Sequence, residues 1–276
     1  MRISDVLDSA RHLGVDRLDA QLLLAHHLQQ PRSWLLAHDD ENLDETTAAH
    51  CNSQLARRAA GEPLAYILGE WSFRGLRLQV TPAVLIPRPE TELLVDWALQ
   101  CLAVAPQASA VDLGTGSGAI ALALASEAPG VAVTASDASL QALDIARGNA
   151  KRLQLAITFT HGDWWQPLAG GRFGLAVSNP PYIAASDSHL AALVHEPGIA
   201  LTPGGNGLGL DALRRIIQGA PEHLLPGAWL LLEHGHDQGP AVRDLLQAQG
   251  FEHAQTRADL AGLPRCSGGR WLPPRR

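Results

Sequence analysis

Four consecutive residues, Asn179-Pro180-Pro181-Tyr182, have the types and the order needed to hold a planar nitrogen group. The two prolines fix the backbone and lack N–H groups, so the carbonyls there have no competing donors beside them. The Asn179 side-chain oxygen and the Pro180 carbonyl can then accept from one –NH2 group, while Tyr182 covers its flat face. Such a clamp aligns the nitrogen for group transfer and stabilises the positive charge that develops on it. We predict catalytic roles for Asn179, Pro180 and Tyr182, and substrate binding by all four residues.

A glycine-rich segment lies about sixty residues earlier, where a predicted strand ends and a helix begins. Gly114, Gly116 and Gly118 alternate there with Thr115 and Ser117. Glycines at such a point allow a tight turn and let a ligand approach the main chain closely. The segment also fits the GxGxxA variant of a dinucleotide site, so the glycines alone leave the cofactor undecided.

Three acidic residues favour S-adenosylmethionine as the cofactor. Asp112 ends the first predicted strand, Asp137 follows the second and Asp163 follows the third, so we expect all three around one crevice. Carboxylates accept hydrogen bonds from ribose hydroxyls and an adenine amino group, and they suit a ligand that carries an ammonium and a sulfonium. Trp164, rather than its neighbour Trp165, is expected to flank the adenine ring. The predicted cofactor-binding residues are Gly114, Thr115, Gly116, Ser117, Gly118, Asp137, Asp163, Trp164 and Asn179.

The elements that must position these residues alternate between strands and helices from Thr91 onward. Candidate strands lie at residues 110–113, 131–136, 156–160, 173–178, 228–233 and 251–256, with a last one near Arg270. Candidate helices lie at residues 119–128, 140–153, 208–220 and 239–249. This alternation predicts a three-layer α/β sheet with crossover helices.

The first sixty residues predict a small helical bundle instead. Ser4 can cap a first helix that Gly14 ends, and Pro31 can open a third one. After the bundle, Leu76 and Leu78 alternate with polar residues, and the turn Arg74-Gly75 can pair them with an earlier strand, which predicts a short β-hairpin.

Composition and charge narrow the class of protein. Hydrophobic residues make up 46% and charged residues 18% of the 276-residue chain, which is a globular composition. The formal net charge of −7 and a single lysine, Lys151, disfavour a long nucleic-acid groove. Cys51, Cys101 and Cys266 lack any CxxC spacing and indicate free thiols, and no signal peptide or membrane span is evident, so we expect a cytoplasmic protein. We expect no metal, because His234 and its neighbours lack a suitably spaced set of ligands.

With both loops identified, the chain resembles the peptide chain release factor glutamine N5-methyltransferase family, known as PrmC or HemK. Residues 85–92, Leu-Ile-Pro-Arg-Pro-Glu-Thr-Glu, resemble the LIPRPxTE signature of the family, and residues 61–69 resemble its linker entry. Glu196-Pro197, Gly204-Gly205 and residues 232–235 match later blocks. The resemblance covers nearly the full length.

The resemblance implies a seven-stranded, Rossmann-like class I S-adenosylmethionine-dependent methyltransferase domain at residues 91–276. It also implies an N-terminal helical domain that binds the release factor at residues 1–75, and we place a β-hairpin linker at residues 76–90. The substrate would be the glutamine of the Gly-Gly-Gln motif in bacterial class 1 release factors. We expect a monomer with no stable nucleic-acid partner and no membrane association.

Three other functions remain as alternatives. An adenine-N6 or guanine-N2 nucleic-acid methyltransferase also uses NPPY-like loops, but it needs a basic groove. A non-catalytic S-adenosylmethionine sensor would have no reason to retain an amide clamp. An NAD-dependent oxidoreductase would need a proton donor after the fourth strand.

Overall fold

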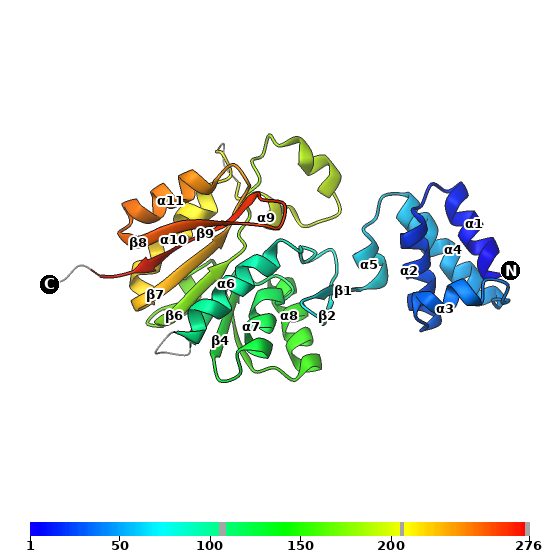
Figure 1. Ribbon diagram of the computed structural model, residues 1–276, viewed down its shortest axis with the longest axis horizontal. Coiled ribbons are helices and arrows are strands. Elements are labelled where there is room, and N and C mark those ends of the chain that lie inside the picture. The colour runs from blue at the N-terminus through cyan, green and yellow to red at the C-terminus, as the bar shows by residue number, and fades with distance from the viewer. Residues whose placement is uncertain (105–108, 205–206, 274–276) are drawn as a thin grey trace. The chain divides into compact units, whose positions relative to one another are not determined.

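The computed structural model describes residues 1–104, 109–204 and 207–273, and Gly205 of the block noted above lies outside them. The chain divides into two compact units, Met1–Glu70 and Trp71–Arg276. Family signatures in the sequence placed the corresponding boundary at residue 75. Figure 1 labels most of the helices and strands of both units.

The first unit is the expected helical bundle. Its helices are α1 (Ile3–His12), α2 (Arg17–Leu28), α3 (Arg32–Ala37), α4 (Glu45–Ala59) and α5 (Leu64–Leu68). Helices α1, α2 and α4 pack on one another around buried side chains such as Ile3, Leu24 and Leu55. The expected cap at Ser4 is wrong, because α1 begins at Ile3 and the Asp5 carboxylate accepts from the Arg2 N–H at 2.7 Å.

The second unit opens with the hairpin of β1 (Glu70–Phe73) and β2 (Leu76–Gln79). Arg74 and Gly75 form its turn with positive φ values of 48° and 75°, as the sequence predicts for a two-residue hairpin turn. The hairpin therefore occupies residues 70–79, earlier than the interval 76–90 expected for the linker.

A three-layer α/β domain follows, and this fold prediction is confirmed. Among the residues described, seven strands form one sheet in the order β5-β4-β3-β6-β7-β9-β8. All neighbouring strands are parallel except β9, which is antiparallel to both β7 and β8. The strands are β3 (Ser109–Leu113), β4 (Ala132–Asp137), β5 (Ile157–His161), β6 (Phe173–Ser178), β7 (Leu224–Glu233), β8 (Phe251–Ala258) and β9 (Pro264–Trp271).

Helices cover both faces of the sheet. One layer contains α6 (Thr91–Ala103), α7 (Ala119–Glu127) and α8 (Leu140–Leu153), and the other contains α10 (Asp211–His223) and α11 (Gly239–Ala248). Short helices η1 (Gln166–Leu168), η2 (Ser188–Leu193) and α9 (Gly198–Leu201) lie in the connections. Helix α10 begins three residues later than expected and β7 begins four residues earlier.

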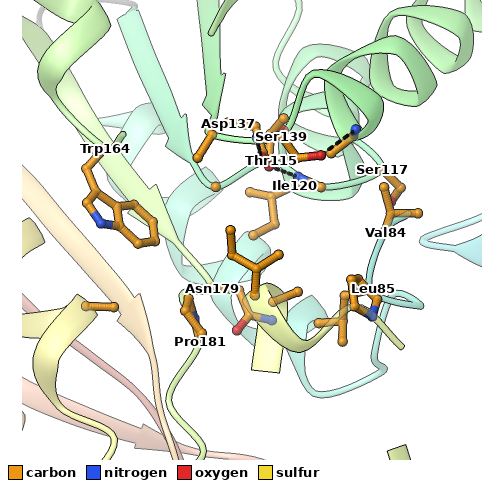
Figure 2. Close-up of a pocket in the computed structure, with 18 of the residues that line it drawn as sticks. Val84, Leu85, Thr115, Ser117, Ile120, Asp137, Ser139, Trp164, Asn179 and Pro181 are labelled. Atoms are coloured by element: carbon orange, nitrogen blue, oxygen red, sulfur yellow. Dashed lines mark hydrogen bonds between the residues drawn. The ribbon is translucent and has the colours of Figure 1, made fainter. Parts of the chain in front are cut away.

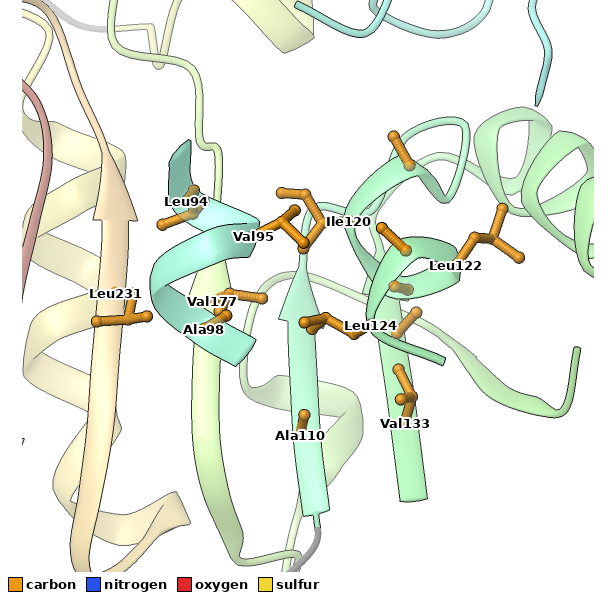
Figure 3. Packing of buried hydrophobic residues seen from close by; sticks show 14 of the residues in the cluster. Leu94, Val95, Ala98, Ala110, Ile120, Leu122, Leu124, Val133, Val177 and Leu231 are labelled. Carbon is orange, nitrogen blue, oxygen red and sulfur yellow. The ribbon is translucent and has the colours of Figure 1, made fainter. Parts of the chain in front are cut away.

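Alternate residues of the central strands fill two separate cores. Ala110 and Val177 pack under α6 and α7, as Figure 3 shows, while Val111 and Ala176 face α10 and α11. Burial on both faces explains why these strands are short continuous apolar runs in the sequence.

The direction of the chain reverses between β3 and β6. From β3 the chain proceeds outward through β4 to β5, and it then returns to β6 on the other side of β3. Ligands of open α/β sheets bind in the crevice at such a switch point, beyond the carboxyl ends of the strands. The predicted glycine loop and the Asn179 loop both begin there.

Candidate active site

Two loops leave the sheet side by side at the switch point. Strands β3 and β6 are paired in register, with Asp112 opposite Val177. The Ser178 hydroxyl, at the end of β6, donates to the carbonyl of Leu113, at the end of β3, at 2.6 Å. The pairing therefore sets the start of the glycine loop next to Asn179, although 65 residues separate Gly114 from Asn179 in sequence.

Gly116 shows why this loop uses glycine. Its φ is +57°, a left-handed conformation that side chains rarely adopt, and no protein atom lies within 4 Å of the position of a Cβ there. The main chain at Gly116 is thus exposed to the open space in front of it. Its N–H donates to Asp137 Oδ2 at 2.8 Å, so the end of β4 holds the glycine loop in place.

The Asp137 carboxylate both holds the glycine loop and lines the cavity. Its other oxygen, Oδ1, accepts from the Ser139 N–H at 2.8 Å at the start of α8. Burial raises the pKa of this carboxyl, and the hydrogen bonds from the Ser139 and Gly116 N–H groups act in the opposite direction. Each carboxylate oxygen keeps further acceptor capacity for a hydroxyl in the cavity that Asp137 lines.

Asp112, by contrast, is not part of the crevice, so the expectation for this residue is wrong. Its side chain is fully buried on the α7 side of the sheet. There Oδ2 accepts from the Thr115 hydroxyl at 2.6 Å and from the Ala121 N–H at 3.2 Å. Burial raises its pKa to about 7. Asp112 therefore supports the glycine loop from behind.

The two tryptophans after β5 have different positions. Trp164 lines the cavity, with its ring beside Gly114 (Figure 2). Trp165 is buried in the second core, where its indole N–H donates to the Ile216 carbonyl at 2.9 Å and its ring stacks on His223. Only Trp164 is thus placed to contact a ligand in this cavity.

These residues enclose a cavity of about 470 Å³, a size typical of sites for small molecules. Figure 2 shows Asp137 and Trp164 on one side of it and Asn179 and Leu85 on another. The predicted residues that line it are Gly114, Thr115, Gly116, Ser117, Asp137, Asp163, Trp164, Asn179 and Pro181. Gly118 is not among them, because a Cβ there would meet Leu122 and Ala146 instead.

Asp163 lines the same cavity but forms an ion pair with Arg215 of α10. Arg215 and Asp211 also contribute to the lining, which sequence reasoning did not foresee. The charged lining consists of Asp137, Asp163, Asp211, Arg88 and Arg215. Three carboxylates against two guanidinium groups give the cavity a mildly acidic character.

A second cavity, of about 340 Å³, lies on the other side of Asn179. Pro180, Tyr182 and Glu233 line it, and Asn179 lines both cavities. Leu85, Arg88 and Ala200 are likewise shared between the two. Asn179 therefore lies at the boundary between the two cavities.

Two side-chain hydrogen bonds join the Asn179 loop to α6 and β7. The Asn179 amide nitrogen Nδ2 donates to the Thr91 hydroxyl at 3.1 Å, and the Tyr182 hydroxyl donates to Glu233 Oε1 at 3.2 Å. Burial and the neighbouring Glu233 raise the pKa of Tyr182, so it remains a neutral donor. Burial also raises the pKa of Glu233, to about 7.

The segment before α6 forms another wall of the first cavity. In the sequence this segment is notable only for its resemblance to the family signature. Residues 83–85 and Arg88 line the first cavity. Glu196 is buried and pairs with Arg88, and its Oε2 accepts from the Ile86 N–H at 3.1 Å. This joins the segment to residues 197–203, several of which line the cavity from the other side.

Solved structures with similar folds support this description of the domain. A Thermus thermophilus 16S rRNA N2 G1207 methyltransferase, in complex with AdoMet and guanosine, aligns with a TM-score of 0.55 and 21% identity over 73% of this chain and 49% of that one. The hMettl16 catalytic domain aligns with a TM-score of 0.57 and 16% identity over 84% of this chain and 86% of that one. At such identities the likeness concerns the fold, which is that of a class I methyltransferase.

Sequence comparison is more specific. The model of the PrmC N-terminal domain matches residues 2–69, and that of the methyltransferase small domain matches residues 91–209. The release factor glutamine methyltransferase of Bordetella pertussis is 49% identical over 259 residues, covering 93% of this chain and 95% of that protein. That of Pseudomonas aeruginosa is 48% identical over 258 residues, covering 92% of each. The chain belongs to the release factor glutamine methyltransferase family, and it is an S-adenosylmethionine-dependent enzyme.

Over the parts of the chain that are described, no helix is long and apolar enough to cross a membrane. In the same parts, no three His, Cys, Asp or Glu side chains gather as metal ligands would. His234 is a core residue, bonded through Nε2 to the Ser267 hydroxyl at 2.8 Å.

Proposed function

We propose that this enzyme transfers the methyl group of S-adenosylmethionine to the side-chain amide nitrogen, N5, of the glutamine in the Gly-Gly-Gln motif of bacterial class 1 release factors. The observation that carries the proposal is the position of Asn179 between two cavities, one suited to the cofactor and one to an amide. The family to which the chain belongs supports the substrate class.

The first cavity fits S-adenosylmethionine in size and chemistry. Asp137 offers acceptors for ribose hydroxyls, the exposed main chain at Gly116 permits close approach, and Trp164 offers a flat face for adenine. The mildly acidic lining suits a ligand with a sulfonium and an ammonium group. When bound, this cofactor supplies an activated methyl group.

The second cavity would receive the glutamine. Asn179 Oδ1 and the Pro180 carbonyl accept from the two hydrogens of the amide nitrogen, which directs that nitrogen toward the first cavity. Tyr182, held by Glu233, covers the flat face of the amide. As the new N–C bond forms and the bond between the methyl carbon and the sulfonium sulfur breaks, the two oxygens would stabilise the positive charge on nitrogen. The nitrogen would then release one proton to solvent, and the neutral thioether would be the leaving group.

The N-terminal helical domain would provide binding energy away from the reacting nitrogen. We assign the docking of the release factor body to this domain, which the match to the PrmC N-terminal domain supports. The domain boundaries, a monomeric state, the absence of a stable nucleic-acid complex and a cytoplasmic location are part of the same proposal.

Transfer of labelled methyl to purified release factor tests the function. We expect label on the intact factor and none on a factor whose Gly-Gly-Gln glutamine is replaced by alanine. Label on the factor that lacks this glutamine would show that another residue is methylated. Labelling of RNA or DNA, with none on the release factor, would support the nucleic-acid methyltransferase alternative.

A further inference from the structure

The clamp described above depends on which way the Asn179 amide is turned. An asparagine side chain has an acceptor on one side and a donor on the other, and the two are nearly equal in shape. Only with Oδ1 toward the second cavity can Asn179 accept from a substrate –NH2 group. With the amide turned over, two –NH2 groups would face each other and the hydrogen bond would be lost.

The partner of Asn179 on the other side is the Thr91 hydroxyl, which is buried at the first position of α6. A hydroxyl carries one hydrogen and can both donate and accept. Taken alone, Thr91 could accept from Nδ2 or donate to Oδ1, so it would not fix the orientation of the amide.

Glu233 removes this ambiguity. Its carboxyl is 1% exposed at the end of β7, and the neighbouring Thr91 side chain favours its ionised form. An ionised carboxylate accepts only, so the Thr91 hydrogen is directed to Glu233 and its lone pairs are left for Asn179. Among the described residues, Glu233 Oε2 is buried without a hydrogen-bond partner, so it can take this hydrogen from the neighbouring Thr91 without losing another bond.

Several other groups near Glu233 influence whether its carboxyl is ionised. The Tyr182 hydroxyl donates to Oε1, and Arg265 of β9 favours the charged form, whereas Glu90 beside α6 opposes it. Cys266 of β9 is a further neighbour, and its own pKa is raised mainly by burial and also by Glu233.

We propose that Thr91 and Glu233 are positioning residues, which hold the Asn179 carbonyl oxygen toward the substrate amide. The inference rests on the function proposed for Asn179. When Glu233 takes up a proton, it can donate to Thr91, the Thr91 hydrogen can turn to Asn179 Oδ1, and the reversed amide becomes as favourable as the productive one.

The decisive variant is Thr91→Val, which removes the hydroxyl and keeps the shape of the side chain. We expect kcat for methyl transfer to release factor to fall roughly 10- to 100-fold, part of the loss expected for a whole preorganised donor or acceptor. Cofactor Kd, measured by calorimetry, should change less than threefold. Thr91→Ser retains the hydroxyl and should recover most of the rate. As a matched control, Thr158→Val at an exposed position of β5, outside both cavities, should leave kcat unchanged.

The pH profile of kcat provides a readout that a purely structural role would not change. For the wild type, kcat should rise with pH through about 7, as Glu233 ionises. Glu233→Gln keeps the size of the side chain but cannot ionise, so this rise should be absent. A wild-type rate in Thr91→Val, or an unchanged pH profile in Glu233→Gln, would overturn the inference. If the wild type itself transfers no methyl to release factor, it is the proposed function that fails.

Discussion

The Gly116 N–H and the Asp137 carboxylate are joined at 2.8 Å, which ties the loop after β3 to the end of β4. One oxygen of Asp137 thus shapes the glycine loop, while the same carboxylate faces the cavity that the loop encloses. Loss of this side chain should affect the cofactor site in two ways at once.

Asp137→Ala is expected to weaken S-adenosylmethionine binding roughly 10- to 100-fold, the range for a hydrogen bond to a charged group. Isothermal titration calorimetry would measure the change. Asp144→Ala, at an exposed position of α8, is the matched control and should bind normally. Equal affinities for the two variants would place the ribose elsewhere.

Asn179→Ala should reduce kcat for methyl transfer by roughly 10²–10³, the scale for loss of one preorganised hydrogen-bonding group. The affinity for the cofactor should change much less, because Asn179 is only one of many residues that line the first cavity. Single-turnover kinetics with saturating release factor would measure the rate. A variant that retains near-normal turnover would refute the clamp.

Gly116→Val should abolish cofactor binding, because a branched side chain is strained at a φ of +57° and would project into open cavity. Gly170→Val separates the two effects. Gly170 has a φ of +78° and free space, but it lines neither cavity. This control should lose stability and still bind cofactor, whereas equal binding losses would implicate backbone strain alone.

A chain that begins at Glu70 lacks the helical bundle and keeps both cavities. It should bind S-adenosylmethionine as the full chain does. Its transfer to whole release factor should fall at least about tenfold, because remote binding energy no longer holds the glutamine in place. A short Gly-Gly-Gln peptide should be methylated slowly and equally by both chains. Equal rates on whole release factor would exclude docking by the bundle.

The buried carboxyl of Asp112 should make the free energy of unfolding decrease as the pH rises. Burial raises its pKa to about 7 from the ordinary value of 3.8, so the folded chain binds this proton more tightly than the unfolded chain does. The stability that this proton provides is full below about pH 4 and is lost as pH rises through about 7. Asp112→Asn stays neutral, so its unfolding free energy relative to the wild type should increase from pH 5 to pH 8 by on the order of 2–4 kcal/mol. Urea denaturation would measure this difference, and a pH-independent difference would contradict the assignment.

The sequence allowed most of the fold to be predicted because buried parallel strands leave a strong pattern. Strand β6 was predicted at its observed bounds, and β3 and β4 to within a residue. The start of β7 was missed because Pro226 and Gly227 normally interrupt strands, whereas here they fall where the pairing with β6 shifts register. Pro221 lies in the last turn of α10 without ending that helix earlier.

The sequence predicts site residues that lie together in one loop. It does not predict contacts between segments that are distant in the sequence. The sequence indicated that Gly116, Asp137 and Asn179 lie close together, and all three line one cavity because each lies at or just beyond the end of a parallel strand. It could not show that the Asp112 side chain points to the opposite side of the glycine loop. Nor could it bring Thr91 to Asn179, because 88 residues separate them and neither is unusual in its own segment.

The sheet order has a consequence for the newly synthesised chain. Strand β3 finds its partner β6 only after β4 and β5 have been made, and Glu233, which ends β7, follows more than fifty residues after Asn179. Domains fold as units during synthesis, with the N-terminal one first. The helical bundle can therefore fold early on the ribosome, whereas the methyl-transfer site becomes complete only when the last third of the chain has emerged.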